Sequence, residues 1–301
     1  MTRVRRLVRS VYLGLHGRTA AYDGVPLRFP PNVGDGLLWS LCRYGTRGFE
    51  PDTWATLRTL LADAKVFLDV GSNIGFYSVL AGKIAPTIEI IAFEPLPALC
   101  DAHRLFCEAN GVAVEFQPLA LSDMNGAATL FLPTEDGDEV STATITKVSW
   151  QARKPHDEIT VRTMKLDTFL ACRPLQMPVV IKIDVEDHDA AVLRGAAETI
   201  ARYRPMIVCE ILPRPVRDPS NINDNRAIDE QHGNRATVAA LDMLNYAAFA
   251  IKPNNYFRFA GDDFARPRSF TDFLLIPRER IISANGTLTI EKLRLRENKQ
   301  N

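Results

Sequence analysis

The sequence predicts an α/β protein in which a mostly parallel sheet is covered by helices on both faces. Short apolar runs alternate with helix-like runs over most of the chain, and the first of these strands ends in a glycine-rich turn at 71–75. Alternation of this kind is typical of strand–helix–strand units, whose crossover helices bury both faces of a parallel sheet. Ligands in such folds bind beyond the carboxyl ends of the strands, so the site is expected there.

Composition limits the possible classes of function. The chain has 301 residues, of which 46% are hydrophobic and 24% charged, enough for one large domain with extensions. The formal net charge is zero, so no overall field favours nucleic acid, and no nucleic-acid partner is expected. Five cysteines without metal-ligand spacing indicate the reduced thiols of a cytoplasmic protein.

The N-terminal segment 1–18 alternates arginines with apolar residues. It lacks the long apolar centre and the small-residue cleavage site of a signal peptide, and no run in the chain approaches the ~18 apolar residues of a membrane span. One interpretation is a basic amphipathic helix in weak peripheral contact with anionic lipid, and the other is a solvated terminal helix. Residues 1–50 are interpreted as a basic arm with a helical extension.

Helices are expected at 37–44 and at 51–61, where Pro51 and Asp52 form a start signal. Regular units follow, recognised by apolar runs of strand length and by longer amphipathic runs. They are strand 66–70 with helix 74–84, strand 88–93 with helix 97–110, and strand 112–118 with the turn 121–126.

The pattern changes at 127–161, where strands 127–132 and 158–164 flank a polar stretch rich in Ser and Thr. This stretch is either a lid over the substrate or a surface loop. Regularity then resumes within a main domain of residues 51–280, before a polar tail at 281–301. The remaining expected elements are helix 166–171, strand 179–186, helix 189–202, strand 205–212, helix 235–246, and strands 247–252 and 270–277 as an antiparallel pair.

The turn after strand 66–70 favours S-adenosylmethionine over a dinucleotide. Asn73 stands where the dinucleotide fingerprint needs its middle glycine, between Gly71 and Gly75. Asp69, at the end of the strand, can pair with the ammonium group of S-adenosylmethionine through a charge-assisted hydrogen bond. Glu94 ends the next strand, where an acid can accept both ribose hydroxyls of either ligand.

A second constellation lies on strand 179–186. A central parallel strand should be almost purely apolar, but Lys182, Asp184 and Glu186 alternate along one face of this strand. Buried charges must pair, bind a ligand or reach an open cleft, so these residues and His188 are candidates for the acceptor site. The alternative is structural: Lys182 and Asp184 form an ion pair, and Asp187 or Asp189 caps the next helix.

Two further interpretations concern acids near this strand. Glu210, at the end of strand 205–212, either completes the acceptor pocket or pairs with an arginine such as Arg214. Asp184 and Glu186 have the oxygen ligands that suit Mg²⁺, but the sequence offers no third ligand, so a metal is not favoured.

Six segments together resemble, in order, the FkbM-type methyltransferase family. They are LDVGSNIGFYS at 68–78, IIAFEP at 90–95, PLALSDMNG at 118–126, VRTMKLDTFL at 161–170, VIKIDVEDHDAAVLRGAAETI at 180–200 and DFLLIP at 272–277. The resemblance implies a class I methyltransferase fold with a seven-stranded, mostly parallel, Rossmann-like sheet. It also implies S-adenosylmethionine as donor and transfer to a hydroxyl, often of a sugar, glycan or related secondary metabolite.

The resemblance also implies which residues hold the donor. Asp69 and the turn from Gly71 through Ser72 and Asn73 to Gly75 surround the methionine part, Glu94 with Pro95 contacts the ribose, and Ser122 with Asp123 contacts the adenine. The sequence departs from the family at Asp187, where glycine is usual, and in the loop VSTAT at 140–144.

Methyl transfer to an alcohol requires alignment of oxygen, methyl and sulfur and removal of the hydroxyl proton. Glu186 or His188 is the expected proton acceptor, with Asp184 orienting the acceptor and Lys182 tuning the carboxylates. One rival is a donor-binding protein without catalysis, which Asp187 supports. A second is an NAD-dependent oxidoreductase, which leaves Asn73 and Asp69 unexplained.

Overall fold

The structure is a computed structural model that describes residues 17–133, 145, 156–212, 226–253, 255–265, 269–284, 287–290 and 293–296. Three features of the sequence analysis lie outside these residues: most of the basic arm, the polar stretch that is a candidate lid, and Arg214. In the part of the chain that is described, no helix combines the length and apolar character needed to cross a membrane.

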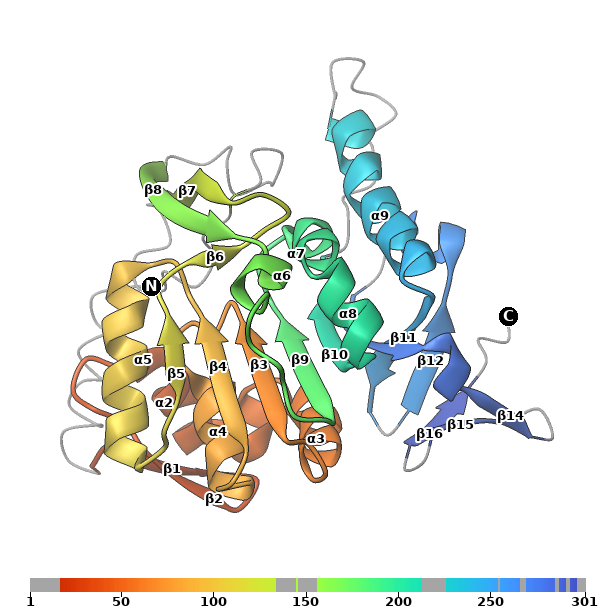
Figure 1. The fold of residues 1–301 in the computed structure, drawn as a ribbon. Coiled ribbons are helices and arrows are strands. Elements are labelled where there is room, and N and C mark those ends of the chain that lie inside the picture. The colour runs from red at the N-terminus through yellow and green to blue at the C-terminus, as the bar shows by residue number, and fades with distance from the viewer. Residues whose placement is uncertain are drawn as a thin grey trace, which may run out of the picture.

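The central sheet has the mixed, mostly parallel arrangement that the sequence predicts. Strands β5, β4, β3, β9 and β10 lie parallel in that order, and β13 and β11 follow, with β13 antiparallel to both of its neighbours (Figure 1). Their bounds are β3 Val66–Val70, β4 Glu89–Phe93, β5 Glu115–Gln117, β9 Val179–Ile183, β10 Met206–Glu210, β11 Tyr246–Lys252 and β13 Asp272–Pro277.

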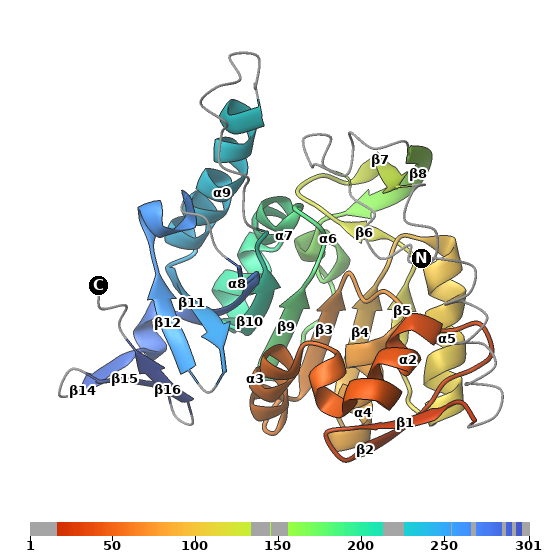
Figure 2. The same cartoon turned by 180° about the vertical axis from the view of Figure 1, so that it is seen from behind.

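Helices cover both faces of this sheet and create two apolar cores. Figure 2 shows α2, α3 and α4 in front of one face, and Figure 1 shows α6 and α8 in front of the other. The first core also receives α5, and the second receives α7 and α9. The bounds are α2 Asp35–Tyr44, α3 Pro51–Leu61, α4 Phe76–Ile84, α5 Pro97–Asn110, α6 Leu166–Phe169, α7 Asp189–Gly195, α8 Ala197–Tyr203 and α9 Arg226–Met243.

A β-hairpin precedes these helices and was not expected from the sequence. Strands β1 (Thr19–Tyr22) and β2 (Val25–Arg28) pair antiparallel around the Asp23–Gly24 turn. Both turn residues have positive φ, as a tight hairpin turn requires. Tyr22 packs edge-on against Phe76 of α4, so the hairpin belongs to the first core. The N-terminal extension is therefore not purely helical.

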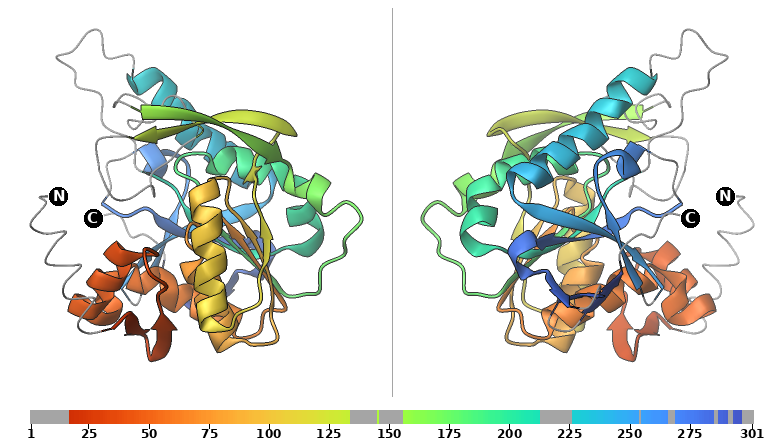
Figure 3. Two further views of the ribbon diagram at one scale, coloured as in Figure 1. Left: turned by 90° about the vertical axis from the view of Figure 1, so that its left-hand side faces the viewer. Right: turned by 90° about the vertical axis from the view of Figure 1, so that its right-hand side faces the viewer.

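A small separate sheet lies above the carboxyl ends of β4 and β5 (Figures 1 and 3). It consists of β6 (Ala120–Leu121), β7 (Gly126–Pro133) and β8 (His156–Met164), in the order β6-β8-β7. The two longer strands were expected from the sequence. They hold a third apolar cluster over this end of the main sheet.

The C-terminal region carries more strands than expected. The antiparallel pairing of β11 with β13 is confirmed, but β12 (Asn255–Phe259) also pairs with β11. The expected polar tail carries β14 (Ile282–Ala284), β15 (Thr287–Ile290) and β16 (Leu293–Arg296), so the structure records an eleven-stranded sheet. Short 3₁₀ helices lie at η1 Gly45–Gly48, η4 Gly261–Ala265 and η5 Arg278–Arg280.

Two expected elements have different ends for backbone reasons. The strand predicted at 179–186 stops at Ile183, and it cannot extend through Glu186 (φ 48°) and Asp187 (φ 76°), because two successive left-handed residues lie outside the β region. The helix predicted at 189–202 is broken at Ala196, whose φ of −112° and ψ of 11° separate α7 from α8.

Candidate active site

A cavity of about 800 Å³ opens at the carboxyl ends of β3, β4, β9 and β10. The turn after β3 and the strand ends form one side. The other side is formed by a segment that we call the N-terminal wall, which comprises Asn32, Gly34–Leu37, Ser40 and Gly48–Glu50. Leu130 of β7 and Ile145 also line the cavity, which therefore extends under the small sheet. This is the edge at which α/β folds bind ligands.

The glycines of the turn are needed for close packing. Gly71 has φ 76°, and a Cβ atom there would lie 1.8 Å from the Asp184 carbonyl oxygen. Gly75 has φ 82°, and its Cβ would lie 2.4 Å from the His103 ring. Asn73, with φ 52°, is the remaining left-handed position of the turn. The turn is thus wedged between the end of β9 and α5, and its backbone lines the cavity.

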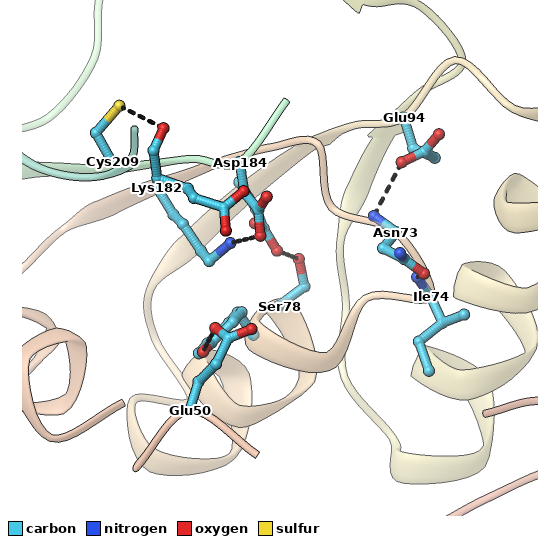
Figure 4. Close-up of polar contacts among 11 residues, drawn as sticks. Glu50, Asn73, Ile74, Ser78, Glu94, Lys182, Asp184 and Cys209 are labelled. Atoms are coloured by element: carbon cyan, nitrogen blue, oxygen red, sulfur yellow. Dashed lines mark hydrogen bonds and ion pairs between the residues drawn. The ribbon is translucent and has the colours of Figure 1, made fainter. Parts of the chain in front are cut away.

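Asp69 has an unsatisfied oxygen at this cavity. The residue is only 1% exposed, and its Oδ2 accepts a hydrogen bond of 2.6 Å from Ser78 Oγ of α4 (Figure 4). Its Oδ1 is buried and has no hydrogen-bond partner among the described residues. Burial raises the pKa of Asp69, and neighbouring Lys182 opposes that rise. A buried acceptor of this kind fits a positively charged donor group of a ligand.

Glu94 is fixed by the backbone of the chain. It is 5% exposed, and one of its oxygens accepts a 3.0 Å hydrogen bond from the Asn73 amide (Figure 4). The other oxygen accepts a 3.0 Å hydrogen bond from the Leu96 amide. Burial raises its pKa to about 7, although both amides favour the ionised form. A carboxylate has about four lone-pair sites, so each oxygen keeps a site for a further donor.

The residues expected at the adenine divide into two groups. Pro95 lines the cavity with Leu119–Leu121, but Ser122 and Asp123 are not among the lining residues. Ser122 Oγ lies 3.0 Å from His188 Nε2, and Asp123 accepts hydrogen bonds from Arg194 at 2.7 and 3.0 Å. These contacts hold the turn at Ser122–Asp123 on the side away from the cavity.

Lys182 and Asp184 form the ion pair that the structural alternative anticipated. Lys182 Nζ lies 2.7 Å from Asp184 Oδ2 and 4.7 Å from the centre of the Tyr77 ring. Burial opposes charge on the lysine, but Asp184 and other acids outweigh it and raise the lysine pKa. Burial likewise acts to raise the pKa of Asp184, but Lys182 outweighs it and lowers that pKa.

The rest of that alternative is wrong. His188 occupies the position before α7, and no side chain caps the helix by a hydrogen bond. Asp189 instead accepts a hydrogen bond of 2.7 Å from Thr237 Oγ1 of α9. Asp187 has φ 76°, so the glycine that is usual at this position in the family matches a left-handed backbone, which Asp tolerates. Asp187 is not among the residues that line the cavity.

Glu186 and His188 both line the cavity, but neither lies on the strand. Glu186 is part of the left-handed turn after β9. The His188 ring is tied to Ser122, and burial lowers its pKa, with Asp123 opposing. Period-two alternation therefore explains the placement of Lys182 and Asp184 but not that of Glu186.

Three acids near the cavity were missed or left open. Glu210 lines it and shares a hydrogen bond with Asp184; burial and Asp184 raise its pKa to about 10. Asp272 is paired with Glu210 across β10 and β13. Glu50 belongs to the N-terminal wall. The acid at the start of DFLLIP could have indicated Asp272, whereas no local pattern distinguishes Glu50 from a surface residue.

The cavity is strongly acidic. Among the described lining residues, Lys182 is the one lysine or arginine, facing several carboxylates. This charge suits a cationic ligand. Within the described residues, no group of three or more His, Cys, Asp or Glu side chains is arranged to hold a metal ion.

Comparison with known proteins supports the resemblance to the FkbM methyltransferase family. A family model described as "Methyltransferase FkbM domain" matches residues 69–236. Hexuronic acid methyltransferase AglP of Haloferax volcanii is 29% identical over 157 residues, which are 50% of this chain and 59% of that protein. Methyltransferase 1 of Beauveria bassiana is 28% identical over 147 residues, 44% of this chain and again 59% of the relative.

Among solved structures, the methyltransferase FkbM of Methylobacillus flagellatus shares 13% identity at a TM-score of 0.38, with 91% of this chain and 59% of that one covered. The chain thus spans about three fifths of the length of the curated relatives that it matches. The family match covers more than half of the chain and includes the turn after β3, Glu94 and the Lys182–Asp184 pair. The chain belongs to the FkbM methyltransferase family.

Proposed function

We propose that this protein transfers the methyl group of S-adenosylmethionine to a hydroxyl of a sugar, glycan or related secondary metabolite. The observation that carries the proposal is the buried Oδ1 of Asp69 at the edge of the cavity, which has no hydrogen-bond partner in the part of the chain that the structure describes. Methionine-derived ammonium is a donor of the right charge for this oxygen. A dinucleotide would leave it without a partner.

The other residues of the turn fit the same ligand. Glu94 is held at the end of β4 with acceptor sites left for the two ribose hydroxyls. Pro95 and Leu119–Leu121 offer an apolar surface for the adenine, with Ser122 and Asp123 fixing that surface from behind. The bound donor supplies a sulfonium-activated methyl group, and the residues of the chain orient it and exclude water.

The acceptor is proposed to lie between the ends of β9 and the N-terminal wall. Lys182, Asp184 and Glu186 line this region and would orient a polar acceptor. His188 would act indirectly, through its contact with Ser122. The name of the Haloferax volcanii relative supports a sugar as acceptor. The balanced charge of the chain supports a small molecule or glycan rather than nucleic acid.

Two measurements on the purified chain test the proposal. Titration calorimetry with S-adenosylmethionine should show one site, and radiolabelled donor should transfer its methyl group to at least one member of a panel of sugars and glycans. Absence of donor binding would overturn the proposal. Binding without transfer to any hydroxyl would instead support a donor-binding protein that lacks catalysis. Repeating both assays with a chelator tests whether Mg²⁺ takes part.

A further inference from the structure

Glu50 is brought to the cavity by the N-terminal extension, which precedes every strand of the main sheet. It lies between η1 and α3 in a left-handed conformation with φ 36°. With Gly48 and Phe49 it forms a part of the N-terminal wall that contacts α4, since Phe49 packs against Phe76 and Glu50 accepts a hydrogen bond from Tyr77. Its carboxylate therefore faces the strand-end residues from the opposite side of the region proposed for the acceptor.

The carboxylate is fixed at one oxygen. Tyr77 Oη donates a hydrogen bond of 2.6 Å to Glu50 Oε2, and the Tyr77 ring in turn lies 4.7 Å from Lys182 Nζ. Figure 4 shows Glu50 on the helix side of the site, facing the ion pair of Lys182 and Asp184. Among the described residues this is the one hydrogen bond made to the Glu50 side chain. Oε1 is thus left for a ligand while the tyrosine fixes its direction.

Burial raises the pKa of Glu50 to about 7. An acid with that pKa is largely ionised at slightly alkaline pH and is still basic enough to take a proton from a hydroxyl that becomes acidic during transfer. The titratable groups that face it are Lys182, which lowers its pKa, Asp184 and Asp272, which raise it, and the phenols of Tyr77 and Tyr22.

We propose that Glu50 is the proton acceptor of the methyl transfer and that Tyr77 is its positioning residue; this rests on the function proposed above. As the acceptor oxygen forms its bond to the methyl carbon, the carbon–sulfur bond breaks and its electron pair stays on sulfur. The hydroxyl proton passes to Glu50 Oε1. The products are a methyl ether, a neutral thioether and a protonated Glu50, which then releases its proton to solvent.

Apart from Glu186, the other acids that line the cavity are committed elsewhere: Asp35 is paired with Arg18, and Asp69 is the proposed partner of the donor ammonium. Asp184 is paired with Lys182 and shares a hydrogen bond with Glu210. Glu210 keeps its proton near neutral pH. Glu94 is held at the turn by two amides, at the end of the cavity proposed for the donor. Glu186 lies on the turn after β9 and is the competing proton acceptor that the experiment must separate.

The test compares Glu50→Gln, Tyr77→Phe and Glu186→Gln with the parent, and uses Asp52→Asn as the matched control, because Asp52 is an acid on the same helix start but does not line the cavity. Donor affinity is measured by calorimetry, and turnover is measured against pH with an acceptor that the panel of sugars and glycans identifies. The amide oxygen that Glu50→Gln introduces can still accept the hydrogen bond from Tyr77. The variant therefore removes the proton acceptor but keeps the contact that positions the side chain. If the unsubstituted protein neither binds S-adenosylmethionine nor transfers its methyl group, the proposed function itself is rejected.

The expected result is that Glu50→Gln keeps donor affinity within about twofold, lowers kcat by about 10²–10⁴-fold, and loses the acid limb of the parent pH profile near pH 7. Tyr77→Phe should lower kcat by about tenfold and retain that limb, since the base remains. Asp52→Asn should match the parent. Parent-like kcat and an unchanged limb in Glu50→Gln would overturn the proposal, as would loss of the limb in Glu186→Gln alone.

If Glu50→Gln does not fold, Glu50→Asp replaces it. The shorter carboxylate is still a base but is retracted from the acceptor, so kcat should fall by about tenfold or more with the acid limb preserved. Turnover equal to that of the parent in this variant would overturn the proposal.

Discussion

At the scale of single residues, the donor site is defined by two buried carboxylates, and the one on Asp69 keeps an oxygen without a hydrogen-bond partner among the described residues. Burying a carboxylate oxygen without a partner costs about 1–3 kcal/mol, so Asp69 Oδ1 is a group that the protein retains at a cost to its stability. Glu94 differs, because both of its oxygens are satisfied by amides before any ligand arrives. The two acids should therefore respond differently to substitution.

Asp69→Asn should weaken S-adenosylmethionine binding by about 1.5–3 kcal/mol, because the charge-assisted contact to the ammonium is lost. Glu94→Gln should weaken it by a similar amount and should also destabilise the turn, since an amide nitrogen cannot accept from Asn73 or Leu96. Calorimetry measures both. Asp101→Asn, an exposed position on α5, is the control. Unchanged affinity in both site variants would contradict the donor assignment.

Gly71→Ala should lower the free energy of unfolding by more than about 3 kcal/mol, because it combines a positive φ with a clash against backbone. Gly111→Ala is the matched control: φ is 65°, but nothing lies within 4 Å of the new Cβ, so only about 1 kcal/mol of conformational cost is expected. Urea denaturation of the two variants separates the cost of the positive φ, which both variants have, from the cost of the clash, which only Gly71→Ala has. Equal losses would show that the contact with Asp184 relaxes easily.

At the scale of elements, sequence periodicity succeeded where burial alone decides the structure. Strand 66–70 and helices 51–61 and 97–110 have the ends that the pattern predicts, because each is bounded by a clear start or stop signal. Strand 179–186 was predicted too long, since alternation continued into residues whose positive φ lies outside the β region. The alternation of side-chain types along a sequence does not show which residues adopt a positive backbone φ.

Other elements depend on contacts that no local pattern contains. The hairpin of β1 and β2 is short, and its Asp23–Gly24 turn is the one local signal that could have indicated it. Glu50 enters the site because α3 and the hairpin pack on the face of the sheet that carries Asp69 and Lys182. Similarly, the pairing of Asp272 with Glu210 follows from the order of strands in the sheet.

Strand β9 carries a buried lysine in register with Asp69 of β3. Lys182→Met should lower the free energy of unfolding by about 3–5 kcal/mol near pH 7, because Asp184 and Asp69 lose their buried partner. The loss should be smaller near pH 5, where those acids can bind protons instead. Lys65→Met, exposed at the start of β3, is the control and should change stability by less than about 0.5 kcal/mol. A loss that does not depend on pH would contradict this account of the cluster.

At the scale of the whole molecule, the cavity is assembled from parts distant in the chain. The turn after β3, the ends of β9 and β10 and the N-terminal wall each contribute acids, so the folded state brings together carboxylates that repel one another. Such repulsion and burial raise acid pKa values in the folded state but not in the unfolded chain. The free energy of unfolding should therefore depend on pH over the range in which these acids titrate.

The contribution of Glu50 to this pH dependence can be measured by comparing the parent with a variant that lacks the carboxylate. Its pKa is raised from 4.5 to about 7, so between these values the folded state binds more protons than the unfolded state, and stability falls as pH rises through this window. After a discount for partial exposure, the fall is about 2 kcal/mol. His103 has the opposite sign, because burial lowers its pKa from 6.5 to about 4, and this contribution is common to parent and variant.

Glu50→Gln removes the titration, so the unfolding free energy of the variant relative to the parent should increase by about 2 kcal/mol between about pH 4.5 and pH 8. Urea denaturation at several pH values, followed by tryptophan fluorescence, measures the difference without any ligand or acceptor. Because the introduced amide can keep the hydrogen bond from Tyr77, the two curves should be closest at low pH, where Glu50 is protonated. Parallel curves over the whole range would mean that Glu50 titrates normally, and the carboxylate would then lack the raised basicity assigned to it in the transfer.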